Sequence, residues 1–169
     1  MMPGCNKRKY HRPILLFLAL SISFNTMAQS DSSKIFEHSK GHWKLPLTSF
    51  EKIDDYKEPP KGFSGDFMGP EIAFYTDSPC VVHAVFDGTV VGVFQIGDSY
   101  ALMTRFGNYF ITYAGLNTPT FKKGAFIKAG QIISGLYKYD SADYKLEVII
   151  SSTKIKRIDP YNWFAWKTR

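Results

Sequence analysis

The chain has 169 residues, 44% of them hydrophobic and 16% aromatic, which is enough for the packed core of one ordinary domain and excludes a mainly disordered chain. Its formal charge is +6, but four of the 21 basic residues and none of the 15 acidic ones lie in the first 28 residues. The rest has 17 basic residues against 15 acidic ones, a surplus of 2, so composition gives no support to nucleic-acid binding. The one dense basic cluster, at 154–157, fits a solvated loop or an edge strand.

The first 28 residues have the pattern of an export signal. Four basic residues precede the apolar run 14–24, which is shorter than the ~20 apolar residues that a membrane span needs. Thr26, Met27 and Ala28 form a small-residue cleavage site. We therefore predict a signal peptide at 1–28, cleavage after Ala28, no stable transmembrane anchor, and a periplasmic or extracellular product. An uncleaved N-terminal anchor is the alternative.

Residues 29–61 are polar and interrupted, and Pro59-Pro60 closes them with a stiff break. We interpret this segment as an N-terminal arm in which Trp43, Leu45 and Leu47 dock a short strand. The domain proper is expected at 62–169.

The histidines offer no convincing metal site. His38 and His42 have the spacing that would put both on one face of a helix, but Gly41 and Pro46 argue against a helix there. His83 lies within an apolar run with no second His or Cys nearby, which favours a packed strand residue over a ligand.

From residue 62 onward, short apolar runs with strand-like alternation are separated by Gly, Asp, Asn and Pro, and no stretch has a convincing helical period. Asp87-Gly88 predicts a tight hairpin turn. The regular spacing of the runs favours an all-β sandwich or barrel of antiparallel strands. The predicted strands are 71–76, 80–86, 88–97, 99–106, 109–115, 125–138 and 145–151.

Five segments follow one another in a typical order: SPCVVHAVFDGTVVGV at 78–93, Y-x-x-L at 113–116, KKGAFIKAGQIISG at 122–135, KLEV at 145–148 and Asp-Pro at 159–160. This order resembles the LytM/lysostaphin-type domain, a family of zinc peptidoglycan endopeptidases built on a duplicated hybrid motif. The resemblance covers about residues 65–164. It implies an all-β duplicated-hybrid-motif fold.

The resemblance also places the family's metal and catalytic positions on side chains that do not suit them. Phe67 stands at the first ligand His and Glu71 at the ligand Asp, while Gly115 replaces an imidazole expected to orient water. Asp143 and Lys145 stand for the two histidines of the closing strand, and an ammonium at the second would repel a cation. Only Glu71 keeps a coordinating group, so we predict no zinc, no other cofactor and no catalytic residue.

If the family's geometry holds, Glu71, Asp143 and Lys145 converge in the vacated site, and Tyr113 and Tyr144 line a groove beside them. Two interpretations stay open. The charged cluster only satisfies polar groups where metal once sat, or the groove takes a peptide or glycan strand.

The predicted export signal and the resemblance together imply a secreted, catalytically inactive LytM-like pseudoenzyme that acts by binding in the bacterial envelope. Its partner would be peptidoglycan, a cell-wall hydrolase or another envelope protein. One alternative is an active zinc endopeptidase that cleaves peptidoglycan cross-links with ligands recruited from His38 and His42. Another is a lipoyl-type carrier domain, which needs an acceptor Lys at a hairpin tip, and DGTV at 87–90 has none.

Overall fold

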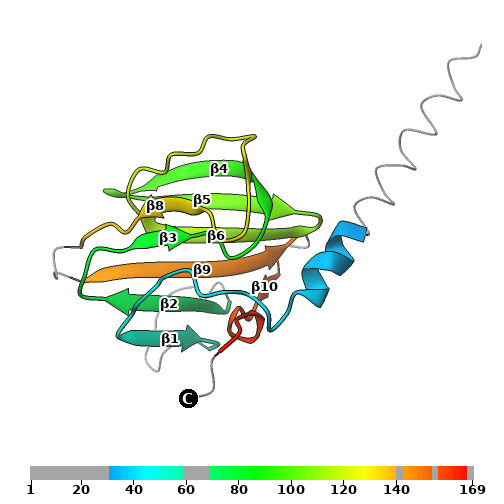
Figure 1. The fold of residues 1–169 in the computed structure, drawn as a ribbon, viewed down its shortest axis with the longest axis horizontal. Helices are drawn as coiled ribbons and strands as arrows, with labels where there is room; N and C mark the ends of the chain where they lie inside the picture. Colours follow the sequence, from blue (N-terminus) through cyan, green and yellow to red (C-terminus); the bar gives the residue numbers. More distant parts are fainter. Residues whose placement is uncertain (1–30, 59–68, 140–142, 154–155, 167–169) are drawn as a thin grey trace, which may run out of the picture.

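The computed structural model of the protein describes residues 31–58, 69–139, 143–153 and 156–166. Within these ranges an eight-stranded sheet lies behind a two-stranded one (Figure 1). Every strand pair in the two sheets is antiparallel. The all-β fold class is therefore confirmed.

The large sheet has the strand order β1-β2-β9-β6-β5-β4-β7, with β10 paired to the far end of β9. The small sheet pairs β3 with β8. The strands are β1 (Lys52–Tyr56), β2 (Glu71–Thr76), β3 (Val81–His83), β4 (Gly88–Ile96), β5 (Ser99–Phe106), β6 (Tyr109–Leu116), β7 (Phe126–Ile127), β8 (Ile132–Gly135), β9 (Tyr144–Ser152) and β10 (Arg157–Ile158).

The core lies between the inner face of the large sheet and the small sheet. On β9, the alternate residues Leu146, Val148 and Ile150 are fully buried. The small sheet contributes Val82 and Ile133, which are also fully buried. Burial of alternate residues is the pattern of a strand with one face on the core, and it leaves the odd-numbered residues of β9 on the outer face.

The turn predicted at Asp87-Gly88 does not form a hairpin. Strand β3 pairs with β8 in the small sheet, whereas β4 pairs with β5 and β7 in the large one. The carboxylate of Asp87 instead accepts a hydrogen bond from the backbone N–H of Ala129 at 2.7 Å. Long-range pairing of β3 therefore overrides the local turn signal.

Two tight hairpins do occur where the sequence has a Gly followed by a short polar residue. Gly97 lies in the turn between β4 and β5, and Gly107 lies in the turn between β5 and β6. Both glycines have φ of +59°, a left-handed conformation that glycine adopts without a Cβ penalty.

The N-terminal arm differs from its prediction in two ways. Residues 31–38 form a helix, here called the arm helix, which lies at one end of the large sheet (Figure 1). Downstream of it, β1 pairs along its whole length with β2. The segments expected as a separate arm and a domain from residue 62 thus share one sheet, and the boundary segment 59–68 lies outside the described residues.

An aromatic cluster holds the described part of this helix in place. The fully buried ring of Phe36 stacks on Tyr109 with 4.3 Å between ring centroids and meets Trp43, Phe86 and Trp163 at 5.3, 5.1 and 4.6 Å. Tertiary packing of this kind stabilises helices that a periodic sequence pattern would not reveal.

Other boundaries follow the prediction with small shifts. The runs 71–76 and 99–106 are strands over their full predicted lengths, whereas 125–138 divides into β7 and β8 around a turn at Gly130. The predicted signal peptide lies outside the described residues. In the described part of the chain, no helix has both the length and the apolar character needed to cross a membrane.

Candidate functional site

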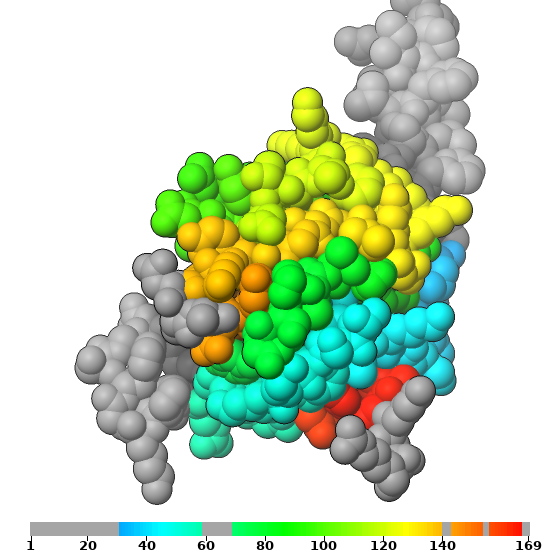
Figure 2. Space-filling view, turned by 60° about the vertical axis from the view of Figure 1, so that its left-hand side comes forward, coloured from blue at the N-terminus to red at the C-terminus, as the bar shows by residue number. Residues whose placement is uncertain are grey.

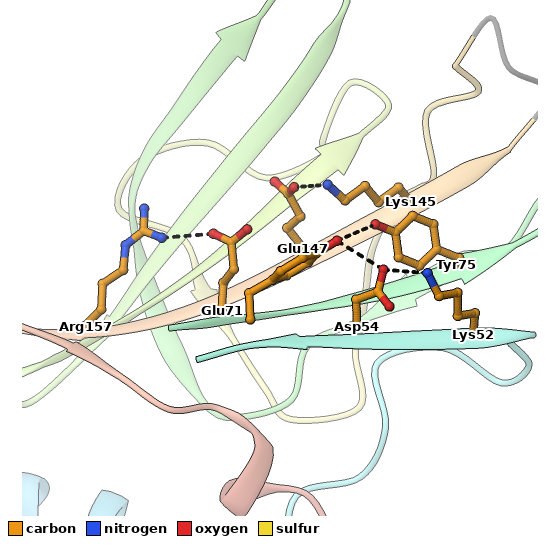
Figure 3. Close-up of polar contacts among 8 residues, drawn as sticks. Lys52, Asp54, Glu71, Tyr75, Lys145, Glu147 and Arg157 are labelled. Carbon is orange, nitrogen blue, oxygen red and sulfur yellow. Dashed lines mark hydrogen bonds and ion pairs between the residues drawn. The ribbon is translucent and has the colours of Figure 1, made fainter. Parts of the chain in front are cut away.

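A charged and aromatic surface covers the outer face of the large sheet where β1, β2 and β9 lie side by side (Figure 3). Strand register creates it, because Lys52 faces Tyr75 and Tyr75 faces Lys145 across the sheet. One row further along, Ala73 faces both Asp54 and Glu147. We call this surface the β1-β2-β9 face. Its polar members are Lys52, Asp54, Tyr56, Glu71, Tyr75, Lys145, Glu147 and Arg157.

The centre of this face is an ion pair within β9. Lys145 Nζ donates a hydrogen bond to Glu147 Oε1, and both side chains are about 30% exposed. Glu147 lies between Ala73 and Ala114 on the neighbouring strands, and these small side chains leave its carboxylate free to turn toward Lys145. Residues two apart on one strand share a face, so the pair follows directly from the KLE sequence.

A second ion pair engages Glu71, which by resemblance keeps the carboxylate of the family's ligand Asp. Arg157 Nη1 lies 2.9 Å from Glu71 Oε2, and both side chains are more than three-quarters buried. The same nitrogen approaches the carbonyl oxygen of Gly69 at 3.5 Å. Arg157 reaches this position because β10 pairs with β9 and brings a cation beside the start of β2.

Two tyrosines also belong to this face, Tyr56 on the edge strand β1 and Tyr75 on β2. The hydroxyls of Tyr56 and Tyr75 are 3.1 Å apart, and Tyr56 donates to Asp54 Oδ2 at 3.0 Å. Lys52 Nζ reaches the same carboxylate oxygen at 2.8 Å. The hydrogen bond from Lys52 lowers the pKa of Asp54 against the opposing effect of burial, so Asp54 is a carboxylate at neutral pH.

Local charges fix the protonation state of Lys145. Burial lowers the pKa of Lys145, but the hydrogen bond and charge of Glu147, together with Tyr56 and Glu71, outweigh burial and leave the pKa above its ordinary value of 10.5. Lys145 is therefore an ammonium throughout the physiological pH range. Its charge and that of Arg157 both oppose the binding of a metal cation at this face.

The chemistry of the donors likewise does not fit zinc. A catalytic zinc site needs three protein ligands, drawn from imidazole, thiolate and carboxylate groups, plus an open position for water. Across the described ranges, no group of three or more His, Cys, Asp or Glu side chains could hold a metal ion. Phe67, at the position of the first ligand, lies outside the described residues.

Gly115 lies beside Lys145 and cannot carry a side chain. Its φ is +84°, and a Cβ placed on it would be 2.1 Å from the backbone oxygen of Lys145. Close approach of the two backbones explains the glycine. An imidazole at this position would require the strands to separate.

The remaining predicted residues do not form one groove with Lys145. Asp143 is exposed just before β9, where its carbonyl oxygen accepts a hydrogen bond from the Tyr139 N–H at 3.2 Å. Tyr144 is partly buried against the core. Tyr113, predicted to line a groove, is fully buried instead, and its hydroxyl oxygen accepts a hydrogen bond from the Val85 N–H at 2.9 Å. Alternation along β6 turns Tyr113 inward.

The histidines of the arm also act separately. His38 ends the arm helix, and its Nδ1 lies 2.7 Å from the Lys34 carbonyl oxygen. His42 lies beyond the helix, with Nδ1 3.0 Å from the Lys40 carbonyl oxygen. Each imidazole thus contacts its own local backbone, and the helix does not place the two rings on a shared face.

Six residues of the face escaped the sequence analysis: Lys52, Asp54, Tyr56, Tyr75, Glu147 and Arg157. Glu147 had a usable signal, because it lies two residues from Lys145 in a strand. Arg157 and Tyr56 had none, since their places depend on pairing between strands far apart in sequence.

Solved structures share this fold. No protein-family model and no curated protein matches the sequence. The chain is similar to the antimicrobial peptidase lysostaphin from Staphylococcus simulans, with 20% identity and a TM-score of 0.58 over 75% of this chain and 56% of that one. The chain has the LytM-type fold.

Two further solved structures match the LytM-type domain described here. Helicobacter pylori Csd3 matches with 19% identity and a TM-score of 0.56 over 72% of this chain. A chain of the SpoIIIAH and SpoIIQ complex matches with 15% identity and a TM-score of 0.55 over 73% of this chain and 100% of that one. This chain covers only about a third of the Csd3 chains, 34% and 33% of their lengths.

Proposed function

We propose that this protein is an exported LytM-type domain that binds in the cell envelope and does not cleave peptidoglycan. The observation that carries the proposal is the Lys145–Glu147 ion pair. By resemblance, Lys145 stands where the family has a metal-binding histidine. A protonated amine there, held by a carboxylate, repels the cation that hydrolysis would need.

The state of Glu71 supports the same proposal. It is the position of the resemblance that keeps the family's own type of ligand, a carboxylate, and Arg157 engages it at 2.9 Å. Recruiting Glu71 to a metal would break a partly buried ion pair and leave the guanidinium without its partner, which is costly. Both ion pairs therefore favour a face that presents charge and hydrogen-bonding groups to a ligand.

The partner class we propose is peptidoglycan or a cell-wall hydrolase or other envelope protein. Peptidoglycan fits the β1-β2-β9 face because glycan and peptide strands offer hydroxyl, amide and carboxylate groups to Lys145, Tyr75 and Glu147. A protein partner is supported by the match to a chain solved in the SpoIIIAH and SpoIIQ complex. The export signal predicted at 1–28 places either partner within reach.

The deciding experiment combines metal analysis with a murein assay on the purified protein. We expect far less than one zinc per chain after incubation with zinc and dialysis, and no release of soluble fragments from murein sacculi. Stoichiometric zinc with chelator-sensitive release of fragments would instead establish the endopeptidase alternative.

Binding is tested by pelleting the protein with insoluble sacculi. Lys145→Met keeps the length of the side chain and removes its charge, so we expect a smaller bound fraction. Lys128→Met is the matched control, because Lys128 is exposed in a turn away from this face. Equal binding by the two variants and the unaltered protein would contradict a role for the β1-β2-β9 face in murein binding.

A further inference from the structure

Strand β4 leaves part of its backbone unpaired at the end of the large sheet opposite the β1-β2-β9 face. Strand β7 pairs only with Gly88 and Thr89 of β4, and the backbone of Val90 bonds to Gly124 and Ala125 at 2.8 Å. From residue 91 to 96, β4 has backbone hydrogen bonds only to β5 in the described part of the chain. An open edge of this kind is a template for another strand.

The open edge is also apolar. Val93, Phe94 and Ile96 are 36, 50 and 57% exposed. Beside it, a hollow of about 500 Å³ lies between β4 and the loop that carries Phe121 and Lys122. In Figure 2 the hairpin of β4 and β5 is the green surface at the upper left, next to the yellow-green surface of segments later in the chain. Soluble proteins usually protect such an edge.

The hairpin turn determines which backbone groups face outward. Ile96 and Ser99 close a two-residue turn, so they form a hydrogen-bonded pair, and Phe94 with Ala101 is the next pair of that kind. The N–H and C=O groups of Val93 and Gln95 consequently point away from β5. Another strand can extend the sheet only if its own free backbone N–H and C=O groups lie opposite those of Val93 and Gln95.

A second copy of β4 meets that condition in one antiparallel register. Val93 of one copy pairs with Gln95 of the other, and the reverse, so each pair can exchange both backbone hydrogen bonds. Phe94 then faces Phe94 of the second copy on the two-fold axis. Because this is a non-hydrogen-bonded pair, their Cα atoms are only ~4.5 Å apart and their rings are in contact.

The same register explains Gly92. The ring of Phe94 lies across Gly92, and a Cβ on Gly92 would be 2.5 Å from that ring. In the antiparallel register Ile96 of the second copy is opposite Gly92, so its side chain covers the exposed ring. Glycine is thus the residue that lets the aromatic side chain lie flat at the contact.

Charge is complementary at both ends of the paired segment. Gly124 and Ala125 occupy the edge beside Val90, so Asp98 of one copy is brought up to Gly124 of the other, the residue after Lys123. Asp98 and Lys123 are both exposed. Two-fold symmetry repeats the Asp98 and Lys123 contact at the other end.

We propose that two copies of this protein associate through β4 in this register, joining their large sheets into one continuous sheet. The five-residue contact is small, so the dimer is weak and concentration-dependent. It leaves the β1-β2-β9 face of each copy open at the outer ends of the joined sheet. The inference is independent of the proposed function.

Sedimentation velocity of the exported protein between about 10 and about 500 μM tests the association. We expect the weight-average mass to shift from that of the monomer toward twice that value. Phe94→Ser should abolish the shift, whereas Ile132→Ser, a change at another exposed apolar side chain on the small sheet, should preserve it. If the protein is a monomer at every concentration, the proposal is wrong. The charges of Lys122 and Lys123 would then be what keeps this edge of β4 unpaired.

Cysteine cross-linking tests the register. In a background with Cys5 and Cys80 replaced by serine, F94C should form a disulfide-linked dimer on mild oxidation, because its two copies are within the 4.4 to 6.8 Å Cα range typical of disulfides. V93C should not, since its symmetry mate is displaced along the strand and beyond that range. Equal cross-linking of the two variants overturns the register.

Charge reversal supplies a test of the end contacts. Asp98→Lys or Lys123→Asp alone should weaken the dimer about tenfold, because each change creates two like-charge contacts. The double variant should recover most of the affinity, while Lys128→Asp should leave it unchanged. Melting temperatures confirm that each variant is folded. Loss of affinity without recovery in the double variant contradicts the Asp98 and Lys123 contact.

Discussion

Gly115 illustrates how a single backbone position limits what the site could become. By resemblance, Gly115 stands where the family has a histidine. The structure shows that replacing Gly115 alone could not restore that side chain. The strand β9 backbone is so close to Gly115 that a Cβ would be 2.1 Å from the oxygen of Lys145. Sequence comparison identifies the absent side chain and gives no sign of this approach.

Gly115→Ala should therefore destabilise the protein strongly. Left-handed backbone costs a non-glycine residue about 1 to 2 kcal/mol, and the clash adds about 1 to 3 kcal/mol. Gly41→Ala is the matched control, because Gly41 has a similar φ of +81° and nothing within 4 Å of its added Cβ. Urea unfolding should give a loss of about 2 to 5 kcal/mol at Gly115 and of about 1 to 2 kcal/mol at Gly41. Equal losses would mean that the strands separate without cost.

At the residue scale, the sequence predicts the identity of the charged groups better than their partners. Glu71 and Lys145 lie on one outer face, as alternation within β2 and β9 requires. Tyr113 could not be placed in the same way, because the resemblance did not say which face of β6 it occupies. The partner of Glu71 is Arg157, 86 residues away, and local pattern carries no information about that contact.

At the element scale, the arm helix shows how a helix can escape sequence analysis. The described helix has eight residues and one fully buried side chain, Phe36, so no apolar repeat can develop. The hydroxyl of Tyr109 donates a hydrogen bond to Glu37 on the adjacent position. Contacts of this helix with distant strands, and not helix propensity, hold it in place.

Phe36→Ala should release the arm helix and lower overall stability. Replacing a fully buried Phe by Ala typically costs about 3 to 5 kcal/mol, and Phe36 contacts four aromatic rings. Ile35→Ala is the control, since Ile35 is the preceding residue and is 59% exposed, so its loss should be within about 0.5 kcal/mol. Chemical unfolding followed by tryptophan fluorescence measures both, because Trp43 and Trp163 border the ring of Phe36. Comparable losses in the two variants would show that the helix contributes little.

Docking of this helix should also weaken in strong alkali. Burial, with help from Glu37, raises the pKa of Tyr109 from 10.0 to about 12. The folded state thus retains the phenol proton more tightly than the unfolded state. The stabilisation is complete below pH 10 and is lost as the pH rises from 10 to about 12. Unfolding measured across this range should show a smaller decline for Tyr109→Phe than for the unaltered protein, and an equal decline would contradict the assignment.

At the scale of the whole molecule, segments far apart in sequence complete one core. The Trp43 N–H donates to the Trp163 carbonyl oxygen at 3.0 Å, and the Trp43 carbonyl oxygen accepts from Ala165 at 2.9 Å. The Pro46 carbonyl oxygen accepts from His83 at 2.8 Å. Turn signals and apolar runs predicted most strands. The docking of the arm between the C-terminal segment and the small sheet depends on contacts between residues far apart in sequence, which such signals do not reveal. The sequence pattern therefore separated two parts that pack as one.

A chain that begins at Gly62 should consequently fail to fold as a cooperative unit. It loses the whole of β1 and three buried side chains, Phe36, Trp43 and Leu47. Each such side chain contributes about 1.5 to 3 kcal/mol, and their sum is comparable to the total stability of about 5 to 15 kcal/mol that a domain possesses.

A chain that begins at Gln29 is the matched control, because it removes only the predicted signal peptide and keeps the arm helix. Thermal unfolding of the control should be a single cooperative transition. The shorter chain should show a broad transition and bind a hydrophobic dye, because Trp163 and Phe86 lose the rings that cover them. Cooperative unfolding of the shorter chain near the melting temperature of the control would place the folding unit within residues 62–169.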